Sequence, residues 1–517
     1  MDKRERNDIF RVLDEETLWT AGQVENSRRL LEKEEMQISL AAHEPCILKN
    51  EKGEKASILL DYGIEIHGGI SLLAWLDSTK RGAKVRVRFG ESAAEAMSEL
   101  GGKTNATNDH ARRDLVVEVG MMSMNPIGET GFRFVRIDLL EPEAVLVIKS
   151  ICAVMVYKDV PYRGSFSCSD PLLNRIWDVG AYTVHLNMQE YIWDGIKRDR
   201  LVWVGDMHPE VTTIKAVFGE DDAVEKSLDF IRKETPLPGW MNNMASYSMW
   251  YVIIVHDWFF YTGKKEFLEK QKDYLKGVAD LLSAHIDEKG QDTVKEGRFL
   301  DWPSEGKKKI VEDLKRLRSY ETDPEDYKQA AALLVMVGAK DAKEANEKLL
   351  KTGGAKGMST FMGYYILTAR AMAGDYEGCL EAIREYWGGM LSLGATTFWE
   401  DFDVDWMKDA ARIDELPKEG QIDVHGAYGR FCYKGYRHSL CHGWASGVTP
   451  WLSENVLGVK ILEPGCKKIK VEPHLGDLEW AKGTYPTPYG EITVSHVKQA
   501  DGSIETTVDA PEEIEVL

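Results

Sequence analysis

The chain has 517 residues, of which 43% are hydrophobic and 29% are charged, and its formal net charge is −20 at pH 7. This composition is typical of a globular protein, and the length exceeds that of one ordinary domain, so we expect two or three packed units. The negative charge disfavours nucleic acids and anionic membranes as partners, because both would repel the protein.

The cysteines and the N-terminus bear on the cellular compartment. Seven cysteines are an odd number and show neither a CxxC motif nor regular spacing, which predicts free thiols in a reducing compartment. The charged start Met1–Asp8 leads into no apolar run, so we expect no secretory signal. No apolar run reaches the roughly 18 residues that a membrane-spanning helix needs. We therefore expect a cytoplasmic protein, unless an export signal has been removed from the chain.

Alternation of apolar and polar residues predicts β-strands in the N-terminal part of the chain, from about residue 57 to 160. Gly, Pro and Asp turns separate the predicted strands, which are Ala56–Leu60, Gly69–Trp75, Ala83–Phe89, Phe132–Leu139 and Ala144–Lys149. This pattern predicts an N-terminal antiparallel β-sandwich domain, residues 1–162.

A helical region follows. Asp170 before Pro171 predicts a helix start, with a capping side chain and a proline at the first helical position. Apolar spacing near 3.6 residues then continues to about Leu452, which makes residues 163–452 the central domain. Further predicted helices are Ala223–Lys233, Ser248–Thr262, Lys265–Ile286, Glu325–Val337, Ala342–Leu350, Thr360–Ala373 and Tyr376–Met390. Their spacing alone fits more than one helical fold.

The pattern reverts to strands after Glu454, and residues 453–517 are predicted to form a third domain. Its predicted strands are Lys467–Val471, Leu478–Lys482, Glu491–Ser495 and Ser503–Val508. The predicted fold class is therefore multidomain α+β, with a helical domain between two β domains.

The stretch Trp193–Asp206 has the composition of a sugar-cleaving site, with three carboxylates, two arginines, a lysine and two tryptophans. Carboxylates protonate a glycosidic oxygen or activate water, tryptophan faces stack on sugars, and arginines hold hydroxyl groups. By composition alone, a charged run with tryptophans is more often a solvated loop. The order of the residues therefore matters more than their composition.

The pattern Asp-x-x-x-Arg-Asp-Arg-Leu-x-Trp-x-Gly-Asp, from Asp194 to Asp206, resembles the catalytic signature of the α-L-rhamnosidases of glycoside hydrolase family 78. Two more segments are similar to this family: Gly394–Glu400, to its general-base segment, and Ser439–Leu452, to its barrel-closing helix. The resemblance implies an (α/α)6 barrel flanked by an N-terminal and a small C-terminal antiparallel β-sandwich. It also implies inverting hydrolysis of terminal α-L-rhamnosyl residues from small glycosides.

The resemblance further implies roles for individual residues. Asp199 takes the place of the general acid and Glu400 that of the general base. Substrate-binding roles fall on Asp194, Arg198, Trp203, Asp206, Trp250, Trp302 and His442. For Trp250 and His442 we also consider purely structural roles, as a core aromatic and as a core histidine at a helix cap. Because the acid must keep its proton at rest, we expect Arg198 and Arg200 to pair mainly with Asp194, Asp206 or the sugar.

One residue departs from the family pattern. The family usually has Glu at the position of Asp199, whose side chain is one methylene shorter. We expect a branch of the family that uses Asp as the acid. The alternatives are a different sugar, or a site in which Asp194 or Asp206 donates the proton.

Other chemistries find little support in the sequence. No nucleotide-binding, zinc-protease or serine-hydrolase motif stands in a usable context, and the histidines show no metal-ligand spacing, so we expect neither metal nor cofactor. One rival is a non-catalytic carbohydrate-binding relative, disfavoured because Asp199, Asp206 and Glu400 are all acidic. The other is another (α/α)6 enzyme, either a lyase, which the paired carboxylates disfavour, or a glycosidase for a different sugar. The expected partner is a small rhamnosylated glycoside, and a homodimer is an assembly that we also consider.

Overall fold

The computed structural model describes residues 18–31, 44–290, 292–295, 299–300, 327–429 and 434–517. Contacts divide the chain into two compact units. Unit 1 consists of Met1–Tyr157, Gly195–Arg200 and Asp409–Cys441, and unit 2 of Lys158–Asp194, Leu201–Lys408 and His442–Leu517. This grouping is coarser than the division at residues 162 and 452, which stays a prediction.

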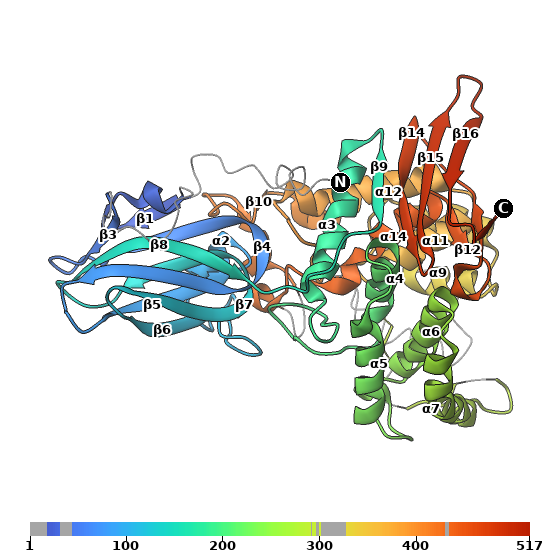
Figure 1. Ribbon diagram of the computed structural model, residues 1–517, viewed down its shortest axis with the longest axis horizontal. Helices are drawn as coiled ribbons and strands as arrows, with labels where there is room; N and C mark the ends of the chain where they lie inside the picture. The colour runs from blue at the N-terminus through green and yellow to red at the C-terminus, as the bar shows by residue number, and fades with distance from the viewer. Residues whose placement is uncertain (1–17, 32–43, 291, 296–298, 301–326, 430–433) are drawn as a thin grey trace. The chain divides into compact units, whose positions relative to one another are not determined.

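Unit 1 is built on an eight-stranded sheet with the strand order β2-β3-β8-β4-β7-β5-β6, in which β1 also pairs with β4. All of its pairings are antiparallel. Figure 1 draws these strands in blue to cyan. Their bounds are β1 Leu18–Ala21, β2 Gln23–Glu25, β3 Cys46–Lys49, β4 Ser57–Asp77, β5 Ala83–Gly90, β6 Asp114–Val119, β7 Ser123–Leu139 and β8 Val145–Met155. Every strand predicted in this region is confirmed, although two of them merge.

The merged pair is strand β4, which takes in both Ala56–Leu60 and Gly69–Trp75. We predicted a turn between these segments, and that prediction is wrong. Two register shifts against β7, between Asp61 and Ile66 and between Gly68 and Ile70, bend the strand without ending it. Gly68 has a φ of +144°, and a Cβ there would overlap the carbonyl oxygen of Val154 on β8. Glycine thus marks a close approach of backbones within one continuous strand.

Two excursions from the helical region belong to unit 1, which the sequence did not reveal. The first is the six-residue segment Gly195–Arg200. The second is Asp409–Cys441, which contains β10 Ala410–Ala411, β11 Ile422–Asp423, α13 Val424–Ala427 and η8 Gly435–Arg437. The second packs against α2 Ala93–Met97, where the N–H of Ala93 donates to the carbonyl of Ile413 at 2.8 Å.

Unit 2 is mainly helical, and its first long helix confirms the predicted start. Pro171 is in the first turn of α3, and the side chain of Asp170 accepts from the N–H of Leu172 at 2.8 Å. The helices are α3 Pro171–Asn187, α4 Met207–Val217, α5 Asp222–Glu234, η2 Met241–Asn243, α6 Ala245–Thr262, α7 Lys265–Ala284, α9 Lys328–Met336, α10 Ala342–Ala345, η5 Asn346–Leu350, α11 Gly363–Met372, α12 Tyr376–Ser392, η6 Val404–Met407, η9 Gly443–Gly447 and α14 Val448–Asn455.

The C-terminal segment adds two sheets to unit 2, drawn in red in Figure 1 except for β9. One has the strand order β16-β15-β14-β9 and the other β12-β13-β17. Their bounds are β9 Ser165–Cys168, β12 Val459–Ile461, β13 Lys468–Val471, β14 Trp480–Thr487, β15 Gly490–Lys498, β16 Ile504–Asp509 and β17 Glu515–Val516. The four strands predicted after Glu454 are confirmed. Strand β9 was not predicted, because it is short and its partner β14 lies far along the chain.

The structure bears on two predictions, that the cysteines are free thiols and that no helix spans a membrane. Six cysteines lie in the described ranges and all are free thiols, as predicted: Cys46, Cys152, Cys168, Cys379, Cys441 and Cys466. Cys432 lies outside the described residues. Within the same ranges, every helix is too short or too polar to cross a membrane.

Candidate active site

Four of the predicted site residues meet in unit 2 around the imidazole of His442. Its Nε2 lies 3.7 Å from Oδ2 of Asp194, 3.8 Å from Oδ2 of Asp206 and 4.0 Å from Oε1 of Glu400. All four residues are buried, with exposed fractions of 2–6%. We call this group the His442 cluster. It brings together residues that are up to 248 positions apart, from Asp194 to His442.

Asp194 is held by Leu201, the residue that directly follows the segment Gly195–Arg200. Its N–H donates to the carbonyl of Leu201 at 3.1 Å, and its Oδ1 accepts from the N–H of Leu201 at 3.0 Å. The N–H of Gly443 donates to its carbonyl at 2.8 Å. Asp194 therefore closes the base of the Gly195–Arg200 excursion and fixes the backbone next to His442.

Asp206 stands immediately before α4, but its carboxylate makes no capping hydrogen bond to that helix. Its Oδ1 instead accepts from the hydroxyl of Tyr247 on α6 at 2.6 Å. The ring of Trp203 meets that of Tyr247 edge to face, with centroids 6.1 Å apart. Tyr247 thus contacts both the carboxylate of Asp206 and the ring of Trp203. We did not predict this residue, because no local sequence pattern marks it.

Glu400 ends the segment Gly394–Glu400, whose backbone is held from two sides. The hydroxyl of Thr360 and the indole N–H of Trp444 both donate to the carbonyl of Glu400, at 2.6 and 2.9 Å. The N–H of His442 donates to the carbonyl of Phe398 at 2.9 Å. These bonds leave the Glu400 carboxylate directed toward His442.

Trp250, on α6, lies in a group of aromatic side chains in unit 2. Its ring is 5.0 Å from that of His208, 5.1 Å from that of Tyr365 and 6.0 Å from that of Phe361, centroid to centroid. Its side chain is only partly buried, which is compatible with both roles that we considered for it. Trp302, another tryptophan with a predicted substrate-binding role, lies outside the described residues.

Glu210 is a site neighbour that we did not predict. It is fully buried on α4, and no described residue forms a hydrogen bond with either of its carboxyl oxygens. A Cβ added to Gly443 would overlap Oε1 of Glu210. Burial first, and then the negative charges of Asp206 and Asp194, raise the pKa of Glu210 well above its ordinary value. Its spacing of four residues from Asp206, which puts both on one helix face, was the available signal.

Asp199 and Arg198 belong to unit 1. Oδ1 of Asp199 lies 2.8 Å from Nη1 of Arg198 and 3.3 Å from Nε2 of His110. Arg198 also donates from Nε to the carbonyl of Arg437 at 2.7 Å, and Arg200 pairs with Glu129 at 2.6 Å. We expected both arginines to pair mainly with Asp194, Asp206 or the sugar. In the structure Arg198 instead contacts the proposed acid, and Arg200 pairs with Glu129.

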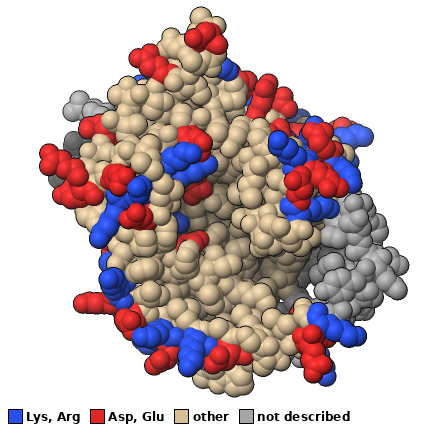
Figure 2. Space-filling view, turned by 90° about the vertical axis from the view of Figure 1, so that its right-hand side faces the viewer, with Lys and Arg blue, Asp and Glu red and all other residues tan. Residues whose placement is uncertain are grey.

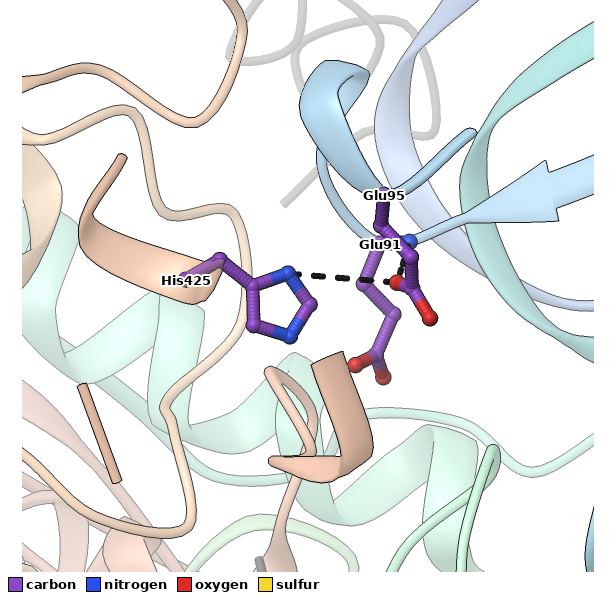
Figure 3. A group of neighbouring side chains, drawn as sticks. All are labelled: Glu91, Glu95 and His425. Carbon is purple, nitrogen blue, oxygen red and sulfur yellow. Dashed lines mark hydrogen bonds and ion pairs between the residues drawn. The ribbon is translucent and has the colours of Figure 1, made fainter. Parts of the chain in front are cut away.

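A buried group in unit 1 has the geometry of a metal site, but protein atoms occupy it. Figure 3 draws the three side chains, Glu91, Glu95 and His425. Each offers a ligand atom within 4.8 Å of the others. The ammonium of Lys197 lies 2.8 Å from Glu91 and 3.3 Å from Glu95. Both ring nitrogens of His425 are hydrogen-bonded, to Ser92 at 2.8 Å and to the carbonyl of His438 at 2.9 Å. We therefore describe the group as a salt-bridge network.

Unit 2 also contains a cavity of about 390 Å³ that is separate from the His442 cluster. None of the four cluster residues lines it; its polar lining includes Lys215, Asp257, Tyr364 and Glu454. On the face that Figure 2 presents, charged side chains lie mainly toward the margin and neutral ones dominate the hollowed centre. The cavity has no part in the proposed site.

The His442 cluster and the aromatic rings define a class of site. Glycoside hydrolysis uses a pair of carboxyl groups, and the His442 cluster brings more than one carboxyl group together. Residues 161–317 match the family model of the bacterial alpha-L-rhamnosidase 6 hairpin glycosidase domain, and residues 458–516 match that of the bacterial alpha-L-rhamnosidase C-terminal domain. These matches confirm the resemblance to the α-L-rhamnosidases of glycoside hydrolase family 78.

Whole-chain comparisons agree. The chain is 23% identical over 530 aligned residues to an alpha-L-rhamnosidase of Alteromonas sp. (strain LOR), covering 87% of this chain and 54% of that protein. Among solved structures, it is similar to a family 78 rhamnosidase of Bacillus sp. GL1, with a TM-score of 0.73, 21% identity and coverage of 92% and 54%. It is also similar to a Streptomyces avermitilis alpha-L-rhamnosidase complexed with L-rhamnose, with a TM-score of 0.68, 16% identity and coverage of 89% and 48%. The chain thus spans about half the length of these relatives.

We predict that Glu210→Gln makes the free energy of unfolding less sensitive to rising pH. The unfolded chain loses this proton near the ordinary pKa of Glu, whereas the folded chain keeps it. The stability that the raised pKa contributes is therefore full below the unfolded value and is lost as the pH rises toward the folded one, by about 1.4 kcal/mol per pH unit. The melting temperature of the variant relative to the wild type should increase from pH 4 upward.

The control for this measurement is Glu381→Gln, at an exposed position on α12. Its melting temperature should follow that of the wild type at every pH. If the difference in melting temperature between Glu210→Gln and the wild type does not change with pH, Glu210 is ionised in the folded protein.

Proposed function

We propose that the protein hydrolyses terminal α-L-rhamnosyl residues from small glycosides by an inverting mechanism, with Asp199 as general acid and Glu400 as general base. The observation that carries this proposal is the His442 cluster, in which three carboxylates from separate segments surround one imidazole. The segments follow the order of the family signature, and the family matches support the choice of sugar.

The fold and the setting are part of the proposal. We infer that the helices of unit 2 form an (α/α)6 barrel and that the N-terminal and C-terminal sheets form β-sandwiches, with domains at residues 1–162, 163–452 and 453–517. The similarity in fold to family 78 rhamnosidases supports this arrangement. Free thiols in the described ranges support a cytoplasmic location.

The mechanism needs one protonated and one ionised carboxyl group. Asp199 donates its proton to the glycosidic oxygen as the bond to the leaving group breaks. Glu400 takes a proton from a water molecule that attacks C1 from the opposite face of the sugar. For an inverting enzyme the two carboxyl groups are expected about 6.5–9.5 Å apart, which leaves room for that water.

The other cluster residues bind the sugar in this scheme. Asp194 and Asp206 accept hydrogen bonds from sugar hydroxyls, and His442, which lies between them and Glu400, bridges the binding and reacting parts of the site. The hydrogen bond from Tyr247 fixes Asp206 before substrate arrives. Trp203 and Trp250 offer faces for the apolar side of a 6-deoxy sugar, and Arg198 holds a hydroxyl.

The substrate prediction is tested on a panel of nitrophenyl glycosides. We expect the purified protein to release nitrophenol faster from the α-L-rhamnoside than from the β-D-glucoside, the β-D-galactoside or the α-L-arabinoside. An equal or higher rate on one of the others would overturn the assignment of rhamnose but leave a glycosidase. No release from any of them would favour a non-catalytic carbohydrate-binding relative.

The roles of the two carboxyl groups predict different responses to substitution. Glu400→Gln should lower turnover by roughly 10²–10⁴ on every rhamnoside, because the attacking water loses its base. Asp199→Asn should be as damaging on a poor leaving group but milder on an activated nitrophenyl group, which needs little protonation. Rates on both substrates, measured for each variant with folding checked by circular dichroism, decide this. If Asp199→Asn is harmless on both while Asp206→Asn is inactive, Asp206 is the acid.

The stereochemical prediction follows from attack opposite the leaving group. Proton NMR during the first minutes of hydrolysis should detect β-L-rhamnose before mutarotation mixes the anomers. Initial α-L-rhamnose would instead mean a retaining enzyme, in which the two carboxyl groups stand only about 5–5.5 Å apart and one bonds to C1.

A further inference from the structure

The side chain of Lys197, in the segment Gly195–Arg200, is bound at several points in unit 1. Its ammonium is buried and lies 2.8 Å from Oε2 of Glu91 and 3.3 Å from Oε1 of Glu95. It also donates to the backbone carbonyls of Tyr436 and His438, at 2.9 and 2.8 Å. A lysine in this position stays charged, because its carboxylate partners outweigh the cost of burial and raise its pKa.

The two carboxylates are themselves held in place. Glu91 accepts from the N–H of Leu440 at 2.7 Å, and Glu95 accepts from the N–H of Glu91 at 2.8 Å. Figure 3 shows both carboxylates beside the ring of His425. Burial, and then the positive charge of Lys197, lower the pKa of His425 well below its ordinary value, so the ring is neutral. In this group Lys197 therefore supplies the charge that compensates Glu91 and Glu95.

The backbone of the same segment packs tightly on the sheet of unit 1. A Cβ added to Gly131 on β7 would lie 2.6 Å from Cγ1 of Ile196 and 2.9 Å from the nitrogen of Lys197. One residue further, Arg198 donates to the carbonyl of Arg437. Asp199 follows directly, and its side chain remains 17% exposed. The buried ammonium of Lys197 and the partly exposed carboxyl group of Asp199 thus belong to residues two positions apart.

We propose that Lys197 is a positioning residue, whose buried ion pairs with Glu91 and Glu95 hold the segment so that Asp199 is presented for proton donation. This inference rests on the proposed function, in which Asp199 is the acid. Removing one partner of a buried ion pair leaves the other uncompensated and is strongly destabilising locally. Misplacing a reacting group by about 1 Å can cost about 10²-fold in rate.

The experiment compares two rhamnosides, one with a dinitrophenyl and one with a phenyl leaving group, for the wild type and Lys197→Met. Only the phenyl group needs a proton to leave. We expect kcat on the phenyl rhamnoside to fall about 10–100-fold and kcat on the dinitrophenyl rhamnoside to fall less than about threefold. Lys84→Met, at an exposed position on β5 of the same unit, is the matched control and should change neither rate.

The outcomes separate this inference from the proposed function. A wild type that is inactive on both rhamnosides contradicts the proposed function. An active wild type combined with equal losses on both substrates, or with no loss, contradicts the positioning role of Lys197. Hydrogen exchange, which does not need activity, should show faster exchange of residues 195–200 in Lys197→Met and no change in Lys84→Met.

A second variant covers the case in which Lys197→Met does not fold. Glu91→Gln/Lys197→Met removes the cation together with the carboxylate nearest to it, so less uncompensated charge stays buried. The double variant should recover thermal stability but not the phenyl rate, because methionine cannot donate to the carbonyls of Tyr436 and His438. Recovery of both would mean that Lys197 serves the stability of unit 1 alone.

Discussion

Carboxylates that are taken out of water must be compensated, and this constraint organises both units of the protein. An uncompensated buried charge costs several kcal/mol, so a folded chain supplies a cation, hydrogen-bond donors or a proton. Unit 1 supplies Lys197 to Glu91 and Glu95. Unit 2 supplies the hydroxyl of Tyr247 to Asp206 and leaves Glu210 protonated. Each of these ways of compensating a buried carboxylate also fixes the geometry of residues that we assign to the site.

The way the chain is divided between the units follows from the same constraint. Glu91 and Glu95 belong to the N-terminal sheet unit, and their compensating cation comes from a six-residue excursion of the helical region. Glu91 has a pKa raised to about 7, because burial outweighs the charge of Lys197 beside it. Without Lys197 the two glutamates would lose the ion pairs that it forms with them. The excursion is therefore bound to unit 1 by charge compensation as well as by packing.

The departure of Asp199 from the Glu that the resemblance implies has a physical counterpart in this structure. A shorter acid reaches less far, so its position depends more on the backbone that carries it. That backbone is held by Lys197, by Arg198 and by the close contact of Gly131 with Ile196. In our proposal, the tightly held segment compensates for the shorter side chain of Asp199, because it fixes the backbone from which that side chain extends.

The sequence by itself predicted the local elements and named the residues of the proposed site. Period-two and period-3.6 patterns are local, so they predicted the strands of both β regions and most helices. The resemblance of three segments to a known family named Asp194, Asp206, Glu400 and His442 as site residues. The tertiary structure decided what depends on residues far apart: the pairing of β9 with β14, the continuity of β4, and the membership of Gly195–Arg200 in unit 1. It also decided the roles of Glu210 and Lys197. Spacing places their side chains on a helix or a loop, whereas burial and the charges of distant neighbours decide whether they keep a proton or hold an ion pair.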